Sequence, residues 1–286
     1  MTSSSEENTI WDKLMSIPDN AIQVVFLLCM IVPLLVPMTI PYGVTPPTKA
    51  FYDTINALPE GSVVLYSMQL IPFNYGDCAA ATASIFNLLL NAPNNLRVIL
   101  VFPASDGPLM FDIMSADYEI LMPEWRKYGE DWVRFGYYAG MEQGFATLCD
   151  DMKTIFPSDY FDNPFDDLPM MSDIKSAADW DLLIEVTSYT AIVDYEVRQA
   201  YGRYGVPCLF APAGMTVMSI IPYYPHISKG FVMGLSGAAQ LNSLQGISGT
   251  LVDLMGNSFS FMTLEAFILA ILGIVSGYML RHRRST

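Results

Sequence analysis

The chain between residues 42 and 257 alternates short, continuously apolar runs with longer segments of helical periodicity. The apolar runs are rich in Val, Ile and Leu and are bounded by turn-forming residues, which is typical of buried strands. We expect strands over 62–68, 96–102, 131–137, 180–187 and 206–211. Since these runs do not alternate with polar residues, they predict a parallel sheet that is covered on both faces.

Segments with apolar residues at helical spacing lie between these runs and carry helix start and stop signals. Asp77 stands at the start of one segment as a candidate N-cap, and Pro93 follows its end. We expect helices over 48–58, 77–91, 106–122, 140–156, 192–204 and 229–244. The alternation predicts an α/β fold, a three-layer Rossmann-like domain with a mostly parallel sheet of about five strands.

Two longer apolar segments flank this domain, and each is long enough to cross a bilayer. The first, 21–40, has no charged residue, although Pro33 and Pro37 loosen its second half. The second, 258–280, contains Glu265 near its start. Together they predict two transmembrane helices, with a continuous second helix that begins near residue 250.

Each apolar segment has an alternative interpretation. A cleaved signal peptide would also place an apolar run near the N-terminus, but segment 1–20 before it is net acidic and no small-residue cleavage site follows. A buried core helix would explain the second run, but the basic tail 281–286 follows it directly, as in a stop-transfer signal. Retained membrane helices are therefore the favoured interpretation.

Basic residues predict the orientation in the membrane. The tail 281–286 contains three arginines, and such residues stay on the cytoplasmic side. Two spans then place segment 1–20 in the cytoplasm as well, and they place domain 42–257 outside it. The sequence thus predicts a protein of the cell (inner, cytoplasmic) membrane with an extracytoplasmic α/β domain and both termini in the cytoplasm.

The chain is acidic as well as hydrophobic. Its formal net charge is −15 although 52% of its residues are hydrophobic, and the domain 42–257 holds 24 of the 29 acidic residues. A surface of this charge repels phosphate groups, so the composition argues against nucleic acid as a partner.

Cysteine content excludes a disulfide scaffold. Cys29 lies in the first apolar segment, whereas Cys78, Cys149 and Cys208 lie in the domain. Three cysteines allow at most one disulfide within the domain, and the sequence does not choose among the pairings.

The sequence lacks the common motifs of nucleotide and hydrolase sites. It contains no G-x-x-x-x-G-K-[ST], no G-x-G-x-x-G after the first expected strand and no G-x-S-x-G. His226 is the single histidine of the domain, which excludes a multi-histidine zinc site, and the aspartates of 159–167 lack the spacing of a calcium loop. We therefore expect no bound metal and no cofactor, and the sequence identifies no catalytic residue.

Parallel sheets bind ligands outside the carboxyl ends of their strands. The polar residues that follow the expected strands are therefore candidates for a ligand-binding crevice. They are Asn74, Asp77, Cys78, Ser105, Asp106, Tyr138, Glu142, Thr187 and Ser188. A helix N-terminus lowers the pKa of a thiol, but Asp77 next to Cys78 acts in the opposite direction and favours a structural role for Cys78.

Two features near the end of the domain suggest an interaction surface. Tyr223 and Tyr224 stand between prolines, in a segment suited to a docking loop or a membrane interface. Gly230 and Gly234 form a G-x-x-x-G spacing, whose small residues let helices approach closely. Packing inside the domain and packing between subunits both explain this spacing.

The chain resembles a family of uncharacterised prokaryotic membrane proteins in three segments: PPTKAFYDTINALPEGSVVL, FGYYAGMEQGFATLCDDM and PYYPHISKGFVMGLSGAAQLNSL. The likeness covers most of 42–257, and it implies the layout of span, extracytoplasmic α/β domain and span. None of these segments is catalytic, so the resemblance implies no activity. The relatives carry an acidic pair after the Gly-Ala-Ala step, where this chain has Gln240 and Leu241.

The sequence favours a non-enzymatic, membrane-anchored protein. Its outer domain would bind a ligand or a partner subunit, either as a homo-oligomer or with other membrane subunits. The alternative is a membrane-bound, hydrolase-like enzyme that uses the crevice at the strand ends. That enzyme would need Asp106, Glu142 and Thr187 within hydrogen-bonding reach of one another.

Overall fold

The computed structural model describes residues 10–35, 43–120 and 122–285. The chain divides into two compact units. One is the α/β domain Pro41–Val252, and the other combines Met1–Ile40 with Asp253–Thr286.

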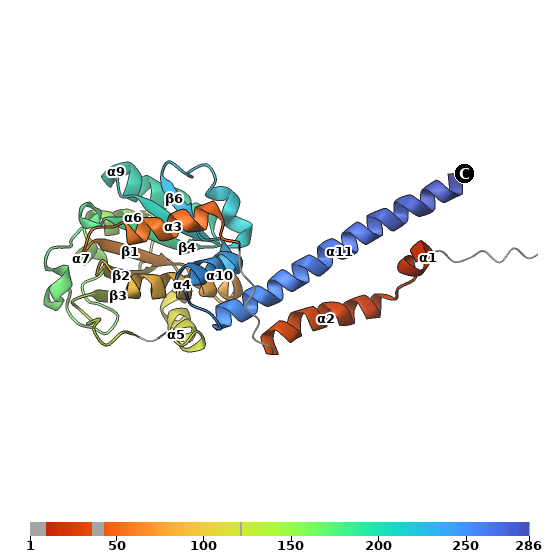
Figure 1. Cartoon of the computed structure of the whole chain (residues 1–286). Helices are drawn as coiled ribbons and strands as arrows, with labels where there is room; N and C mark the ends of the chain where they lie inside the picture. Colours follow the sequence, from red (N-terminus) through yellow and green to blue (C-terminus); the bar gives the residue numbers. More distant parts are fainter. Residues whose placement is uncertain (1–9, 36–42, 121, 286) are drawn as a thin grey trace, which may run out of the picture. The chain divides into compact units, whose positions relative to one another are not determined.

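The α/β domain is built on a six-stranded sheet in which every paired strand is parallel, in the order β3-β2-β1-β4-β5-β6 (Figure 1). This confirms the predicted α/β class and parallel sheet. The strands are β1 Val63–Met68, β2 Arg97–Phe102, β3 Trp132–Tyr137, β4 Leu182–Thr187, β5 Cys208–Pro212 and β6 Ser228–Phe231.

The expectation of about five strands missed β6. This strand has only four residues, Ser-Lys-Gly-Phe, and it contains no apolar run. It pairs on one side only, with β5, so a continuous hydrophobic sequence is not needed there. The expected helix over 229–244 is wrong in its first part, because β6 occupies that part and α10 begins only at Gly234.

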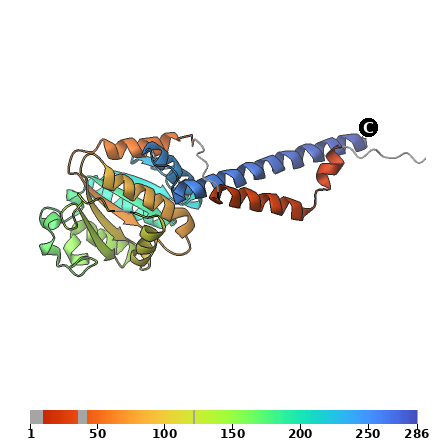
Figure 2. The same cartoon turned by 60° about the horizontal axis from the view of Figure 1, so that its bottom comes forward.

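Helices cover both faces of the sheet (Figures 1 and 2). On one face lie α3 Pro46–Asn56, α4 Tyr75–Asn91, α5 Gly107–Asp117 and α10 Gly234–Leu244. The other face is covered by α6 Met141–Asp150, α7 Met152–Ile155 and α8 Thr190–Glu196, which continues through a π turn, Val197–Tyr201, into α9 Gly202–Tyr204.

Each face has its own hydrophobic core. Tyr66 and Phe86 are fully enclosed on the α4 face, and Leu65 and Phe145 are fully enclosed on the α6 face. Burial of one such side chain contributes roughly 1.5–3 kcal/mol, so the two cores stabilise the sheet from both sides. The apolar character of β1, β2 and β4 follows from this double burial.

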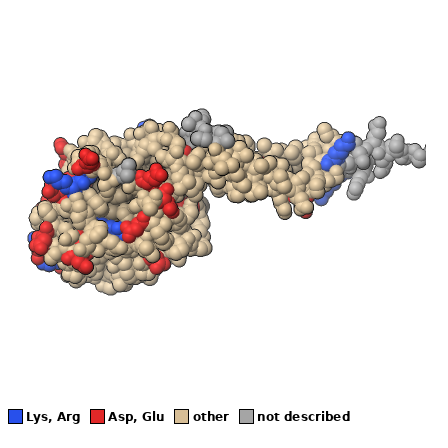
Figure 3. All heavy atoms as spheres, turned by 90° about the horizontal axis from the view of Figure 1, so that it is seen from below, with Lys and Arg blue, Asp and Glu red and all other residues tan. Residues whose placement is uncertain are grey.

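The second unit consists of helices α1 Ile10–Met15 and α2 Asp19–Leu35 and of α11 from Asp253 onward; α11 as a whole is Leu251–Ser285, and its first two residues belong to the α/β domain. Leu251–Met279 is long and apolar enough to cross a membrane by length and composition. Figures 1 and 2 show α11 as one continuous helix, as its sequence predicts. Figure 3 shows a long, mostly uncharged stretch on the visible surface of these helices, with basic side chains gathered at one end, whereas acidic ones are spread over the α/β domain.

The prediction of two transmembrane helices is not confirmed. Helix α2 has 17 residues and includes Pro33. At about 1.5 Å per residue it spans roughly 25 Å, less than the roughly 30 Å of a bilayer core. Residues 36–40 of the expected first span lie outside the described residues.

The two glycines of the G-x-x-x-G spacing pack inside the domain. Gly230 lies in β6 beneath α3, where an added Cβ would lie 2.6 Å from the carbonyl oxygen of Pro47 and would clash with the backbone nitrogen of Phe51. Gly234 has a φ of +46° at the start of α10. Because these residues do not share one helix, their spacing is not a helix-packing motif here.

We predict that Gly230→Ala destabilises the domain by about 3 kcal/mol or more, since the backbone of α3 must move to admit a methyl group. The matched control is Gly202→Ala in α9, where an added Cβ would lie in ordinary contact with the Val197 carbonyl oxygen, at 3.6 Å. We expect the control to stabilise by about 0.5–1 kcal/mol. Urea unfolding of both variants measures the difference, and equal stabilities would contradict the packing of β6 on α3.

Candidate functional site

The strand order places a topological switch point between β1 and β4, where successive connections leave in opposite directions. In open parallel sheets this is where the crevice for ligands forms, outside the carboxyl ends of the strands. The switch point is therefore the expected position of a ligand-binding site.

Polar side chains meet at this point and bind one another. Gln69 Oε1 accepts hydrogen bonds from the Ser188 amide and from Thr187 Oγ1, both at 2.9 Å. Asn74 Nδ2 donates to the Gln69 carbonyl at 2.7 Å and to Ser188 Oγ at 3.0 Å. The structure thus brings together three predicted residues, Asn74, Thr187 and Ser188. Gln69, which the sequence analysis did not single out, connects them.

Asp77 holds neighbouring loops together. It lies in the first turn of α4, whose N-cap is Asn74, so its prediction as the N-cap is wrong. Asp77 Oδ2 accepts from the Gly214 amide at 2.7 Å, and Oδ1 accepts from the Leu235 amide at 3.2 Å. One carboxylate therefore joins the start of α4 to the loop after β5 and to the start of α10.

The negative charge of this carboxylate also affects which ligands can bind at the switch point. Dinucleotide-binding domains place a pyrophosphate at the N-terminus of the first crossover helix, where backbone amides and the helix dipole attract anions. Asp77 puts a negative charge in that position on α4 and occupies two of the nearby amides. The electrostatics therefore disfavour phosphate-bearing ligands here.

The cysteines carry no activated thiol. Cys78, Cys149 and Cys208 are buried and free, so no disulfide forms in the domain. Burial raises the pKa of the Cys78 thiol, and the charge of Asp77 raises it further. A protonated, enclosed thiol is a poor nucleophile.

Two buried carboxyl groups lie beneath the switch point. Glu185 of β4 stands opposite Ser67 of β1 in the sheet, and Glu196 ends α8; both carboxyl groups are fully enclosed. Ser67 Oγ donates to Glu196 Oε1 at 3.0 Å. Tyr138, a predicted site residue, is enclosed with them: its hydroxyl donates to Glu196 Oε1 at 3.5 Å.

This environment favours the protonated acids. Burial raises the pKa of Glu185 well above its usual range, and the charge of Glu196 adds to the effect. Burial also raises the pKa of Glu196, although hydrogen bonds from Ser67 and Tyr138 limit the rise. Neither acid forms an ion pair within the described residues, and ionisation of one opposes ionisation of the other, so both are shifted toward the protonated form. Glu185 lies within the apolar run WDLLIEVT, and an acidic residue inside a run expected to form a buried strand is a sequence signal for a functional or structural carboxyl group.

The other predicted crevice residues lie apart from this centre. Glu142 pairs on the surface with Arg198 at 2.9 Å and accepts from Gln199 at 3.0 Å. Ser105 and Asp106 are exposed at the start of α5. In the described part of the chain, no hydrogen bond joins any two of Asp106, Glu142 and Thr187.

The predicted docking residues contact their own domain. Tyr223 donates to Asp194 Oδ1 at 2.8 Å, and the ring of Tyr224 packs edge-on against Phe231 with 5.5 Å between centroids. Both rings are partly exposed. These contacts give both residues a packing role inside the domain.

The aspartates of 159–167 stabilise a loop. Asp159 is buried and accepts hydrogen bonds from Tyr128 at 2.6 Å and from the amides of Phe161 and Asn163 at 2.8 Å. Burial opposes ionisation, but these bonds outweigh it and lower the pKa of Asp159. Among the described residues, no group of three or more His, Cys, Asp or Glu side chains is arranged to hold a metal ion.

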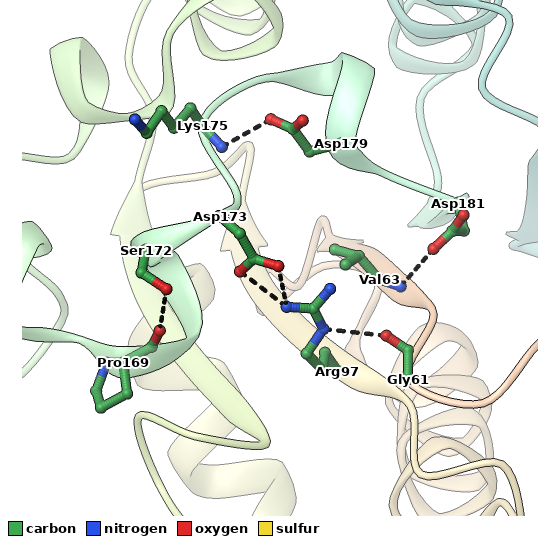
Figure 4. A network of polar contacts seen from close by, with 9 residues as sticks. All are labelled: Gly61, Val63, Arg97, Pro169, Ser172, Asp173, Lys175, Asp179 and Asp181. Atoms are coloured by element: carbon green, nitrogen blue, oxygen red, sulfur yellow. Dashed lines mark hydrogen bonds and ion pairs between the residues drawn. The ribbon is translucent and has the colours of Figure 1, made fainter.

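The amino edge of the sheet is closed by a polar network (Figure 4). Arg97 Nη1 contacts both carboxylate oxygens of Asp173 at 2.9 Å, and Arg97 Nε donates to the Gly61 carbonyl at 3.0 Å. Asp181 accepts from the Val63 amide at 2.8 Å, at the first residue of β1. This edge is therefore structural, and the loops at the carboxyl edge remain the candidate functional face.

Comparison of the chain with protein-family models, curated proteins and solved structures finds no match.

We predict that stability falls as pH rises from about 5 to about 8, because the buried pair keeps protons that the unfolded chain releases above its ordinary pKa of 4.5. Glu196→Gln keeps the shape without the acid and should flatten this dependence by roughly 1–3 kcal/mol. The exposed Glu124→Gln is the control, and it should retain the wild-type slope. Urea unfolding at several pH values measures both, and an unchanged slope in Glu196→Gln would contradict the assignment.

Proposed function

We propose that the chain is a non-enzymatic, membrane-anchored protein whose extracytoplasmic α/β domain binds a partner subunit within a membrane assembly. The observation that carries this proposal is a set of exposed apolar side chains on the loops at the carboxyl edge of the sheet. We call it the apolar loop surface and define it as Phe73, Met215, Met218, Ile221 and Met233.

The apolar loop surface is unusual in its exposure. Phe73 is 78% exposed, and Met215 and Met218 are each 74% exposed. Large apolar side chains grouped on a surface favour association, and methionine adapts its shape to different partners.

The loops that carry these residues are held close to one another. Met215 follows Gly214, and Met233 lies two residues before Leu235; the amides of Gly214 and Leu235 both bind Asp77. Phe73 precedes Asp77 in the loop between β1 and α4. The common anchor supports a single surface rather than isolated exposed residues.

The membrane helices support an assembly as well. Glu265 lies within the apolar helix α11 and is only 8% exposed. It lines an apolar pocket of about 380 Å³ between α2 and α11. It forms no ion pair within the described residues, and an acidic group in such a helix is costly unless a partner compensates it.

The alternative of a hydrolase-like enzyme has lost its main support. It needed Asp106, Glu142 and Thr187 in one pocket, but Glu142 is engaged by Arg198 and Thr187 by Gln69. The side chains at the switch point satisfy one another, and Asp77 disfavours anionic substrates. No observation favours a particular reaction.

We predict that Phe73→Lys combined with Met215→Lys disrupts the assembly in the full chain extracted in mild detergent. Loss of two buried apolar contacts should weaken association by about tenfold or more. Native mass spectrometry measures the stoichiometry. The control is Leu109→Lys on α5, a residue that is 60% exposed but lies outside the apolar loop surface. A wild-type chain that is a monomer with no bound partner, or a double variant that assembles normally, counts against the proposal.

The orientation is tested separately. With both termini in the cytoplasm, protease added to spheroplasts should cut within 42–257, whereas protease added to sealed inverted vesicles should cut only the terminal segments. The reverse pattern would overturn the proposed orientation.

A further inference from the structure

A second site lies away from the carboxyl edge. A pocket of about 350 Å³ opens between the last turns of α4, the residues that follow α5 and the end of α10. Its lining includes Ser84, Asn87 and Asn91 from α4, Tyr118 and Glu119 after α5, and Asn242 of α10. All of its residues belong to the α/β domain. The volume is in the range of pockets that hold small molecules.

The pocket contains a buried polar group that no protein atom satisfies. Ser84 is 2% exposed, and within the described part of the chain its Oγ has no hydrogen-bond partner. A buried hydroxyl without a partner is destabilising by about 1–3 kcal/mol. Less than 1 Å² of the Oγ atom itself is accessible, so the hydroxyl reaches a molecule in the pocket only after its side chain rotates.

The electrostatic environment of the pocket is negative. Among the described residues that line it, Glu119 is the one that carries a charge. Helices α4, α5 and α10 all end at the pocket, and the C-terminus of a helix carries a negative partial charge. Arg126 binds the Leu89 and Leu90 carbonyls at 3.0 Å and offsets part of the dipole of α4, but it does not line the pocket.

Glu119 occupies a position where glycine is the usual residue. The Glu119 amide bonds to the Ala116 carbonyl at 3.2 Å, and the Ile120 amide bonds to the Ser115 carbonyl at 2.9 Å. This is the Schellman pattern that ends many helices, and its left-handed residue is usually glycine. Glu119 adopts a φ of +50° there, which is unfavourable for a side chain with a Cβ. A glutamate at this position costs stability, and it places a carboxylate at the pocket.

We propose that this pocket binds a small organic cation that carries an ammonium group. Glu119 and the helix C-termini supply the charge complementarity. The side-chain oxygens of Asn91 and Asn242 supply hydrogen-bond acceptors, since their amide nitrogens donate to Asn87 and Thr250. The ring of Tyr118 adds an aromatic wall of the kind that attracts cations.

The test uses the full chain in detergent and three probes of similar length: 1,4-diaminobutane, 1,4-butanediol and succinate. Thermal unfolding and calorimetry measure their binding. We expect 1,4-diaminobutane to raise the melting temperature in a saturable manner. The diol and succinate should have little effect, because one lacks the charge and the other is repelled.

Glu119→Gly separates function from structure. Glycine suits the left-handed backbone, so the melting temperature without ligand should stay the same or rise, whereas affinity for 1,4-diaminobutane should fall about fivefold to tenfold. Asp162→Gly is the matched control, since Asp162 is an exposed acid with a φ of +65° outside the pocket lining. This control should bind the diamine as the wild type does.

Four results would overturn the proposal. One is the absence of a diamine-induced shift in the wild type, and another is an equal shift with the diol. The third is undiminished binding by Glu119→Gly, which would assign the effect to general attraction by the acidic surface. The fourth is an equal loss in Glu119→Gly and Asp162→Gly.

Discussion

Burial of the sheet on both faces is the constraint on which the rest of this structure depends. It requires β1 and β4 to be apolar along most of their length, and it encloses any polar residue placed within them. Glu185 and Ser67 stand opposite each other in these strands, at the switch point. Because water is excluded there, the carboxyl groups of Glu185 and Glu196 are more stable protonated than charged. The same enclosure leaves the loops at the carboxyl edge as the places where the domain meets its surroundings.

The switch point of this domain does not have the features with which the same strand order binds dinucleotides in other proteins. The strand order is that of dinucleotide-binding domains, but the loop after β1 lacks their glycines. Asp77 stands where those domains attract a pyrophosphate, and Gln69 joins Thr187 and Asn74 by hydrogen bonds. The arrangement of Asp77 and Gln69 is therefore explained by the hydrogen bonds with which they hold the loops together. Fold similarity alone would have suggested a nucleotide, which is why function has to be argued from the site.

The sequence predicted the α/β class, the parallel sheet and most of its strands, because buried parallel strands are continuous apolar runs. It failed at β6, where a four-residue strand that pairs only with β5 has no hydrophobic signature. From the sequence, Asn74, Thr187 and Ser188 were also expected at one place, because strand ends in a parallel sheet meet at one edge. The hydrogen bonds of the structure join them there. The ion pair of Glu142 could not be predicted, because its partner Arg198 is 56 residues away. The pocket at Glu119 could not be predicted either, because it depends on how three helices end. Such long-range partners leave no periodic signal in the sequence.

The anchoring role of Asp77 has a consequence for molecular recognition. Loops tied to one carboxylate are already ordered before any contact is made, because the Gly214 and Leu235 amides are fixed. Association normally has to overcome the entropy of ordering interface groups, at about 0.5–1.5 kcal/mol for each flexible side chain that is immobilised. With the backbone of these loops already fixed, only the apolar side chains of the surface, most of them methionines, have to be ordered. The loops after β1, β5 and β6 thus form a preorganised backbone that carries adaptable side chains.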